Sequence, residues 1–150
     1  MKIEDIIKSG NMTLAKQAIM NVMYANSVVA ENIYEIMKAY DLSPEQFNVL
    51  RILRGQKGKP ANMGDIQDRM IAKTSNTTRL VDKLLLKELV NRKVCPANRR
   101  QLEITITAKG LELLKELDPK VDGHEAKFAN NLTIEEQEQL IALLEKYRTI

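Results

Sequence analysis

The side chains best suited to chemistry in this chain lie between Lys73 and Arg100. Over that segment eight basic side chains stand against two acidic ones, whereas the whole chain of 150 residues carries a formal net charge of only +3. A local surplus of Lys and Arg of this kind is typical of a surface that binds the phosphates of duplex DNA. Short polar residues from Thr74 to Thr78 open the same segment, and their side chains can donate to and accept from base edges. The segment therefore predicts binding of double-stranded DNA.

Two other interpretations of the basic segment stay open. A run of charge is most often a solvated surface, and a basic surface also suits an acidic protein partner. A winged-helix protein-interaction module without DNA binding is therefore the alternative function. DNA binding is favoured because the charge surplus, the polar helix start and the basic turn at Arg99 and Arg100 fall in one stretch of the chain.

Catalytic and metal chemistry have few candidates. The chain has one cysteine, Cys95, and one histidine, His124, so neither a disulfide nor an all-His/Cys zinc site can form within it. We expect Cys95 to pack in a hairpin rather than act as a thiol sensor, and His124, flanked by acidic residues, to be a solvated helix residue. No glycine-rich phosphate loop occurs. The sequence predicts no enzyme activity, no catalytic residue, no metal site and no cofactor.

Length and composition fit one globular domain in the cytoplasm. With 44% hydrophobic and 29% charged residues, a chain of 150 residues can bury a sizeable core without cross-links. No apolar run approaches the ~20 residues of a membrane span. Glu4 and Asp5 stand where a signal peptide would begin its apolar core. We therefore expect no contact with a membrane.

The elements around the basic segment read as a winged helix-turn-helix. Ser43 with Gln46 forms a capping box for one helix, and Asn62 begins a second that ends near Met70. A third helix is expected over Thr74–Glu88, which completes a helix-turn-helix. From residue 89 the hydrophobic period changes to two, and two strands joined by a basic, turn-rich link at 96–101 predict a β-hairpin wing.

Long helices are expected on both sides of this lobe. Apolar residues from Ile19 to Tyr40 step by three and four, which predicts a helix of roughly 25 residues. Such a helix is long for a small domain to cover, so we expect part of its apolar face to pack against another chain. The alternative is an ordinary core helix. After the hairpin a further helix is expected to bend or break at Pro119, and Thr133 caps the last one. The fold class is mainly α.

Two motifs resemble the MarR (multiple antibiotic resistance regulator) family of winged-helix transcription regulators. Thr77–Leu84 (TTRLVDKL) resembles the recognition helix of the family. Asn98–Arg100 followed by Leu102–Gly110 (LEITITAKG) resembles its wing and the start of the next helix. The resemblance extends from about residue 14 to about residue 147. It implies a homodimer that represses transcription from a pseudo-palindromic operator.

The resemblance also implies an organisation of the chain. It describes a single MarR-like domain over 1–150, in which about 1–40 and 111–150 form a helical dimerisation region. The winged-helix DNA-binding lobe spans about 41–110. The dimer contacts are then expected at Ile19, Val22, Leu140, Leu144 and Tyr147.

Roles for individual DNA-binding residues follow from the same resemblance. The recognition helix would enter the major groove, while the wing would place Arg100 in the minor groove and Arg99 on the backbone. Lys83 and Lys87 are expected to contact phosphates. The expected DNA-binding residues are Thr74, Ser75, Asn76, Thr77, Thr78, Arg79 and Lys83 in the helix, and Asn98, Arg99 and Arg100 in the wing.

The family further implies an effector, and the chain departs from the family at two positions. A small apolar or aromatic ligand would release the DNA, and Tyr24, Tyr34 and Met37 are candidates to line its site, unless they are core residues. Asn98 stands where the family has an aspartate that holds the inserted arginine. Glu88 stands where a glycine is expected, so the turn there either avoids positive φ or carries mild strain.

Overall fold

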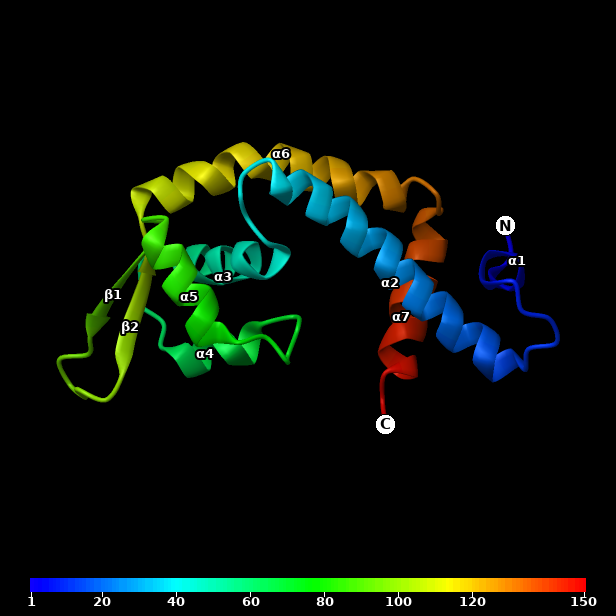
Figure 1. Ribbon diagram of the computed structural model, residues 1–150, viewed down its shortest axis with the longest axis horizontal. Helices are drawn as coiled ribbons and strands as arrows, with labels where there is room; N and C mark the ends of the chain where they lie inside the picture. The colour runs from blue at the N-terminus through cyan, green and yellow to red at the C-terminus, as the bar shows by residue number, and fades with distance from the viewer. The chain divides into compact units, whose positions relative to one another are not determined.

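The computed structural model describes all 150 residues and consists of seven α-helices and one β-hairpin (Figure 1). The mainly α winged-helix fold, with helices before and after the winged-helix lobe in the chain, is confirmed. The elements are α1 (Ile3–Ile7), α2 (Leu14–Lys38), α3 (Pro44–Gly55), α4 (Met63–Arg69), α5 (Thr77–Leu86), β1 (Val90–Val94), β2 (Leu102–Ile106), α6 (Ala108–Ala129) and α7 (Ile134–Tyr147).

The chain divides into two compact units, Met1–Asp41 and Leu42–Ile150. The first unit contains α1 and α2, which contact each other. The hydroxyl of Thr13 accepts a hydrogen bond from the Lys16 amide and caps α2, whose 25 residues match the expected length. Over 21–30, nearly three turns of this helix are exposed throughout.

The second unit has its core between α3, α4, α5 and the hairpin. The local signals of the sequence explain where α3 begins, because the Ser43 hydroxyl accepts from the Gln46 amide at 3.1 Å while the Gln46 side chain accepts from the Ser43 amide at 3.3 Å. The same reciprocal pair of bonds, between Asn62 and Asp65, starts α4. Helix α6 also contributes to this core, and the large, fully buried side chains of the core are Val49, Leu50, Leu53, Ile66, Met70, Val81, Leu84, Val90, Ile104, Leu114 and Leu117.

The hairpin forms the expected wing. Its strands pair antiparallel from Val90 opposite Ile106 to Val94 opposite Leu102. Ala61 adds an isolated bridge to Ile104, with backbone bonds of 3.0 and 2.8 Å, and so attaches the hairpin to the segment before α4. Cys95 is half-buried at the end of β1.

Helix α6 is not interrupted at Pro119, so the expectation of a break at this residue was wrong. The helix runs without interruption over 22 residues with Pro119 inside it. Proline removes one backbone hydrogen bond, but Leu117 and Val121 on either side are buried and hold the helix in place. The two terminal guanidinium nitrogens of Arg54 in α3, Nη1 and Nη2, also donate to the carboxylate of Asp118, at 2.9 and 3.0 Å.

The start of α6 lies against the turn that follows α5. A Cβ at position 110 would lie 2.5 Å from the Leu89 carbonyl oxygen and 2.7 Å from the Ile106 side chain. Gly110 therefore permits a contact between helix and turn that no other residue allows.

Helix α7 buries none of its residues within the chain. Its start is fixed by a capping box between Thr133 and Glu136, as the sequence predicts. Leu140 and Leu144 are 45% and 39% exposed, and Tyr147 continues the same face. A well-capped helix thus presents a row of apolar side chains to solvent. No helix of the structure combines the length and the apolar character that crossing a membrane would require.

His124 is buried, which contradicts the expectation of a solvated residue. Only 8% of it is exposed, and its ring meets the edge of the Phe128 ring with 5.2 Å between centroids. It follows Leu117 and Val121 at helical spacing on the buried face of α6. Burial lowers the pKa of His124 below its ordinary value of 6.5, and this outweighs the opposing charge of Glu125.

Stability should therefore fall as the pH drops below about 6.5. The unfolded chain takes up a proton at His124 near its ordinary pKa, while the folded chain still holds the neutral ring. In His124→Gln this contribution should be absent, so the free energy of unfolding of the wild type minus that of the variant should decrease as the pH falls from 7.5 towards 5. Urea unfolding across that range measures the difference, and parallel curves would show that the ring titrates normally.

Candidate nucleic-acid interface

Helix α5 begins and ends inside the range expected from the sequence. Asn76 is its N-cap and accepts from the Arg79 amide at 3.1 Å, so Thr74 and Ser75 lie in the preceding turn rather than in the helix. At the other end Glu88 has a φ of 59°, a left-handed conformation that no helix can continue. The expected helix over Thr74–Glu88 is corrected to Thr77–Leu86.

One side of α5 is buried and the other carries most of the expected DNA-binding residues. Val81 and Leu84 pack in the core of the lobe. The exposed side chains at the start of the helix and just before it are Thr74, Asn76, Thr78, Arg79 and Lys83. Ser75 is half-buried. Of the seven residues expected to bind DNA in or just before this helix, six therefore have side chains that are at least partly exposed.

Thr77 is the exception. It is 5% exposed, and its hydroxyl donates to the side-chain oxygen of Gln67 in α4. Thr77 therefore holds α5 against α4 and is not part of the exposed interface. The sequence does indicate that Thr77 is buried, because helical spacing puts it on the same face of α5 as the core residues Val81 and Leu84.

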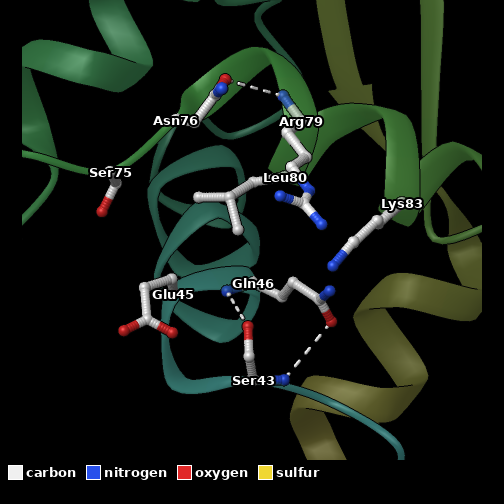
Figure 2. A pocket seen from close by; sticks show the side chains of 8 residues that line it. All are labelled: Ser43, Glu45, Gln46, Ser75, Asn76, Arg79, Leu80 and Lys83. Carbon is white, nitrogen blue, oxygen red and sulfur yellow. Dashed lines mark hydrogen bonds between the residues drawn. The ribbon is translucent and has the colours of Figure 1, made fainter.

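A hollow of about 380 Å³ lies between the start of α3 and α5 (Figure 2). The Arg79 and Lys83 side chains reach into it from α5, and Glu45 lies on the opposite wall. Two cations against one carboxylate make its α5 side a favourable place for a phosphate. Its lining is Ser43, Glu45, Gln46, Ser75, Asn76, Arg79, Leu80 and Lys83.

Lys87 belongs to the lobe rather than to the interface. Its ammonium donates to the Gln46 side chain at 3.0 Å, and its carbonyl accepts from the Lys109 ammonium at 3.0 Å. The expectation that Lys87 contacts a phosphate is therefore not supported by its position. Lys83 keeps that assignment because it is exposed.

The wing tip is polar and ordered by its own side chains. The Asn98 oxygen accepts from the Arg100 amide at 3.1 Å, a short-range bond that shapes the turn. Asn98 thus holds the backbone of Arg100 and not its guanidinium. Arg99 and Arg100 are both exposed. Farther down the hairpin, Arg92 pairs with Asp82 of α5 at 2.9 Å and ties the wing to that helix.

The wing tip and the start of α5 lie on one side of the lobe, away from α6 (Figure 1). This arrangement places an exposed helix start and a basic hairpin tip where one duplex can meet both.

The turn at Glu88 has a positive φ, so of the two outcomes expected for this position the backbone shows the strained one. A side chain with a φ of 59° costs roughly 1 kcal/mol. Its carboxylate, 84% exposed and 3.8 Å from the Lys109 ammonium, offsets little of that cost.

Glu88→Gly should therefore raise the free energy of unfolding by about 0.5–1 kcal/mol. Glycine adopts the left-handed conformation without the Cβ clash. Urea unfolding measures the change. Glu88→Ala is the matched control, because it removes the same carboxylate but keeps the Cβ, and equal stabilisation by alanine would rule out strain as the cause.

The Tyr and Met residues expected at an effector site do not share one surface. Tyr24 and Tyr34 are exposed on α2, whereas Met37 of the same helix is fully buried. Among the expected dimer contacts, Ile19 and Val22 of α2 and the three residues of α7 all retain exposed apolar surface.

Comparisons with known proteins agree with this geometry. A family model described as MarR family matches residues 42–102. The HTH-type transcriptional regulator MhqR of Bacillus subtilis is 32% identical over 107 residues, which cover 71% of this chain and 72% of that protein.

Two solved structures share the fold. A Staphylococcus aureus MepR–DNA complex has a TM-score of 0.76 at 23% identity and covers 91% of this chain and 97% of its own. Bordetella bronchiseptica BpsR, in a structure on regulation of DNA binding by 6-hydroxynicotinic acid, has a TM-score of 0.81 at 20% identity, covering 94% and 99%. Together with the helix-turn-helix, the wing and the identity to MhqR, these matches show that the chain belongs to the MarR family of winged-helix transcriptional regulators.

Proposed function

We propose that this protein is a homodimeric transcriptional repressor that binds a pseudo-palindromic operator and is released by a small apolar or aromatic effector. The observation that carries the proposal is the exposed start of α5 beside an exposed basic wing tip. The cytoplasm is the expected place of action, because the DNA partner is met there.

The contacts to DNA divide by type. Asn76, Thr78 and Arg79 stand at the start of α5, where a recognition helix meets base edges in the major groove. Lys83 lies one turn farther along and would contact a phosphate. Arg100 would enter the neighbouring minor groove, whose negative potential favours a guanidinium. A solved complex of MepR with DNA supports DNA binding by a protein of this fold.

A second copy of the chain would cover the exposed apolar side chains of α2 and α7. An apolar row such as Leu140, Leu144 and Tyr147 on a well-formed helix marks an interaction surface. Ile19 and Val22 would add to the same interface. Two identical lobes related by a two-fold axis then require an operator with matching half-sites.

Release of the DNA by an effector requires only that the effector bind two arrangements of the dimer with different affinities. A ligand that binds the dimer more tightly in an arrangement unsuited to the operator lowers DNA binding by that ratio. Regulation of DNA binding by 6-hydroxynicotinic acid, as described for BpsR, supports an aromatic effector. Tyr24 and Tyr34 are the exposed candidates to contact it.

Selection from randomised duplexes tests the central proposal. We expect enrichment of one inverted repeat, bound by two chains per duplex in sedimentation with labelled DNA. Failure to enrich any sequence would sink DNA recognition and favour the protein-interaction module. Enrichment of a single, unrepeated half-site bound by one chain would refute the dimeric mode.

A further inference from the structure

We infer that Gln67 is a positioning residue that sets where the recognition helix begins and thereby controls discrimination between DNA sequences. The part of this inference that concerns DNA discrimination rests on the proposed function. It concerns a residue of α4 that lies outside the expected interface and is only half-exposed.

The side-chain amide of Gln67 reaches both ends of the turn between α4 and α5. Its nitrogen donates to the Lys73 carbonyl at 2.8 Å. Its oxygen accepts from the Thr77 hydroxyl at the first residue of α5. Only a side chain with a donor and an acceptor on one rigid plane can make both bonds.

The Thr77 end of this arrangement is buried. Because Thr77 is almost inaccessible to water, its hydroxyl would lose its hydrogen-bond partner if the amide were removed. Three further bonds hold the turn from other directions: Ile71 N donates to the Asn48 side chain at 3.0 Å, Ser75 N to the Ala72 carbonyl at 3.0 Å, and the Lys73 ammonium to the Asp68 carbonyl. None of these three reaches α5. Besides the cap that Asn76 makes at the start of α5, Gln67 is the side chain that connects α4 to both the turn and the first residue of the helix.

The residues that follow this link are the ones expected to read bases. Asn76 and Thr78 flank Thr77 directly, and Arg79 comes next. Base readout depends on side-chain placement to within about 0.5 Å, whereas phosphate contacts through long basic side chains tolerate a shift. Loss of the link should therefore reduce the affinity for the operator much more than the affinity for unrelated DNA.

Gln67→Met is the main test, since methionine keeps the length of the side chain and removes both bonds. We expect the ratio of operator affinity to random-duplex affinity to fall about tenfold, with random-duplex affinity changed less than about twofold. Thr77→Val should give the same fall, and Thr77→Ser should restore the wild-type ratio. Fluorescence anisotropy with both duplexes measures each value.

Gln137→Met is the matched control. Gln137 also bonds backbone carbonyls across a turn, those of Ala129 and Leu132 at 3.2 and 3.3 Å, but between α6 and α7. We expect no change in the ratio for this variant. An equal fall in Gln137→Met, or an unchanged ratio in folded Gln67→Met and Thr77→Val, would overturn the inference.

Amide hydrogen exchange of the free protein separates this inference from the proposed function. We expect exchange at the Ser75 and Arg79 amides to become faster in Gln67→Met and to stay at the wild-type rate in Gln137→Met. That result supports the link even if wild-type protein selects no operator. Unchanged exchange contradicts it even if the operator is found.

Discussion

Replacing Leu140 and Leu144 together by aspartate should leave the protein monomeric at micromolar concentration and abolish operator binding. The two side chains lie one turn apart on α7 and keep 45% and 39% of their surface exposed. In a two-fold dimer each substitution counts twice, so four leucine contacts are lost, each contributing about 0.6–1.2 kcal/mol if the exposed share becomes buried. Aspartates in the same places would bring unpaired charges into the interface. Sedimentation velocity and gel shift measure the two effects.

Ala142→Asp is the control for added charge, because residue 142 lies on the other side of α7 and is exposed. It should remain a dimer that binds the operator. Helical content by circular dichroism shows whether the double variant keeps its fold. A double variant that stays dimeric would refute α7 as the interface. A folded monomer that binds the operator with wild-type affinity would instead refute the need for a dimer.

Arg100→Ala should weaken operator binding by about 1–3 kcal/mol, roughly 5- to 150-fold. The side chain is exposed at the wing tip, and Asn98 orders its backbone, so little has to be rearranged before the guanidinium enters a groove. The loss should be largest for operators whose flanking sequence has a narrow, A·T-rich minor groove. Anisotropy titrations over a range of salt concentrations measure it.

Lys83→Ala and Lys115→Ala provide comparisons at two other exposed lysines. Lys83→Ala should weaken binding to all sequences alike and reduce the slope of log K against log salt by about one. Lys115 is exposed on α6, a helix that lies away from the wing tip (Figure 1), and its loss should leave both the affinity and the slope close to wild type. If Arg100→Ala weakened binding no more than Lys115→Ala, the minor-groove assignment would have to be given up.

Local signals predicted most of the fold because they act over three or four residues. The capping pairs at Ser43 and Asn62 and the change of hydrophobic period near residue 89 each depend on neighbours in the sequence, and the structure confirms all three. The break predicted at Pro119 does not occur because the rule that proline interrupts a helix considers only the local backbone. Here the buried side chains of the neighbouring turns keep the helix continuous.

The candidate site was less predictable because it depends on contacts between elements. Lys87 was expected at a phosphate, but its partner lies 41 positions earlier in the sequence and no local pattern indicates it. Thr77 and His124 were misassigned from their polar neighbours, although both stand at helical spacing from buried residues. Periodicity was the better guide than composition at these two positions.

The contact at Gly110 means that α6 cannot pivot freely on the lobe. At Gly110 the helix start lies directly against the Leu89 carbonyl, and the paired bonds from Arg54 to Asp118 hold the helix a second time just over two turns later. Helix α6 and the winged-helix lobe are therefore expected to rotate together as one rigid body. At 1.5 Å per residue the 22 residues of α6 are about 33 Å long. A tilt of about 6° at one end thus shifts the other by about 3.4 Å, the rise of one base step along a strand.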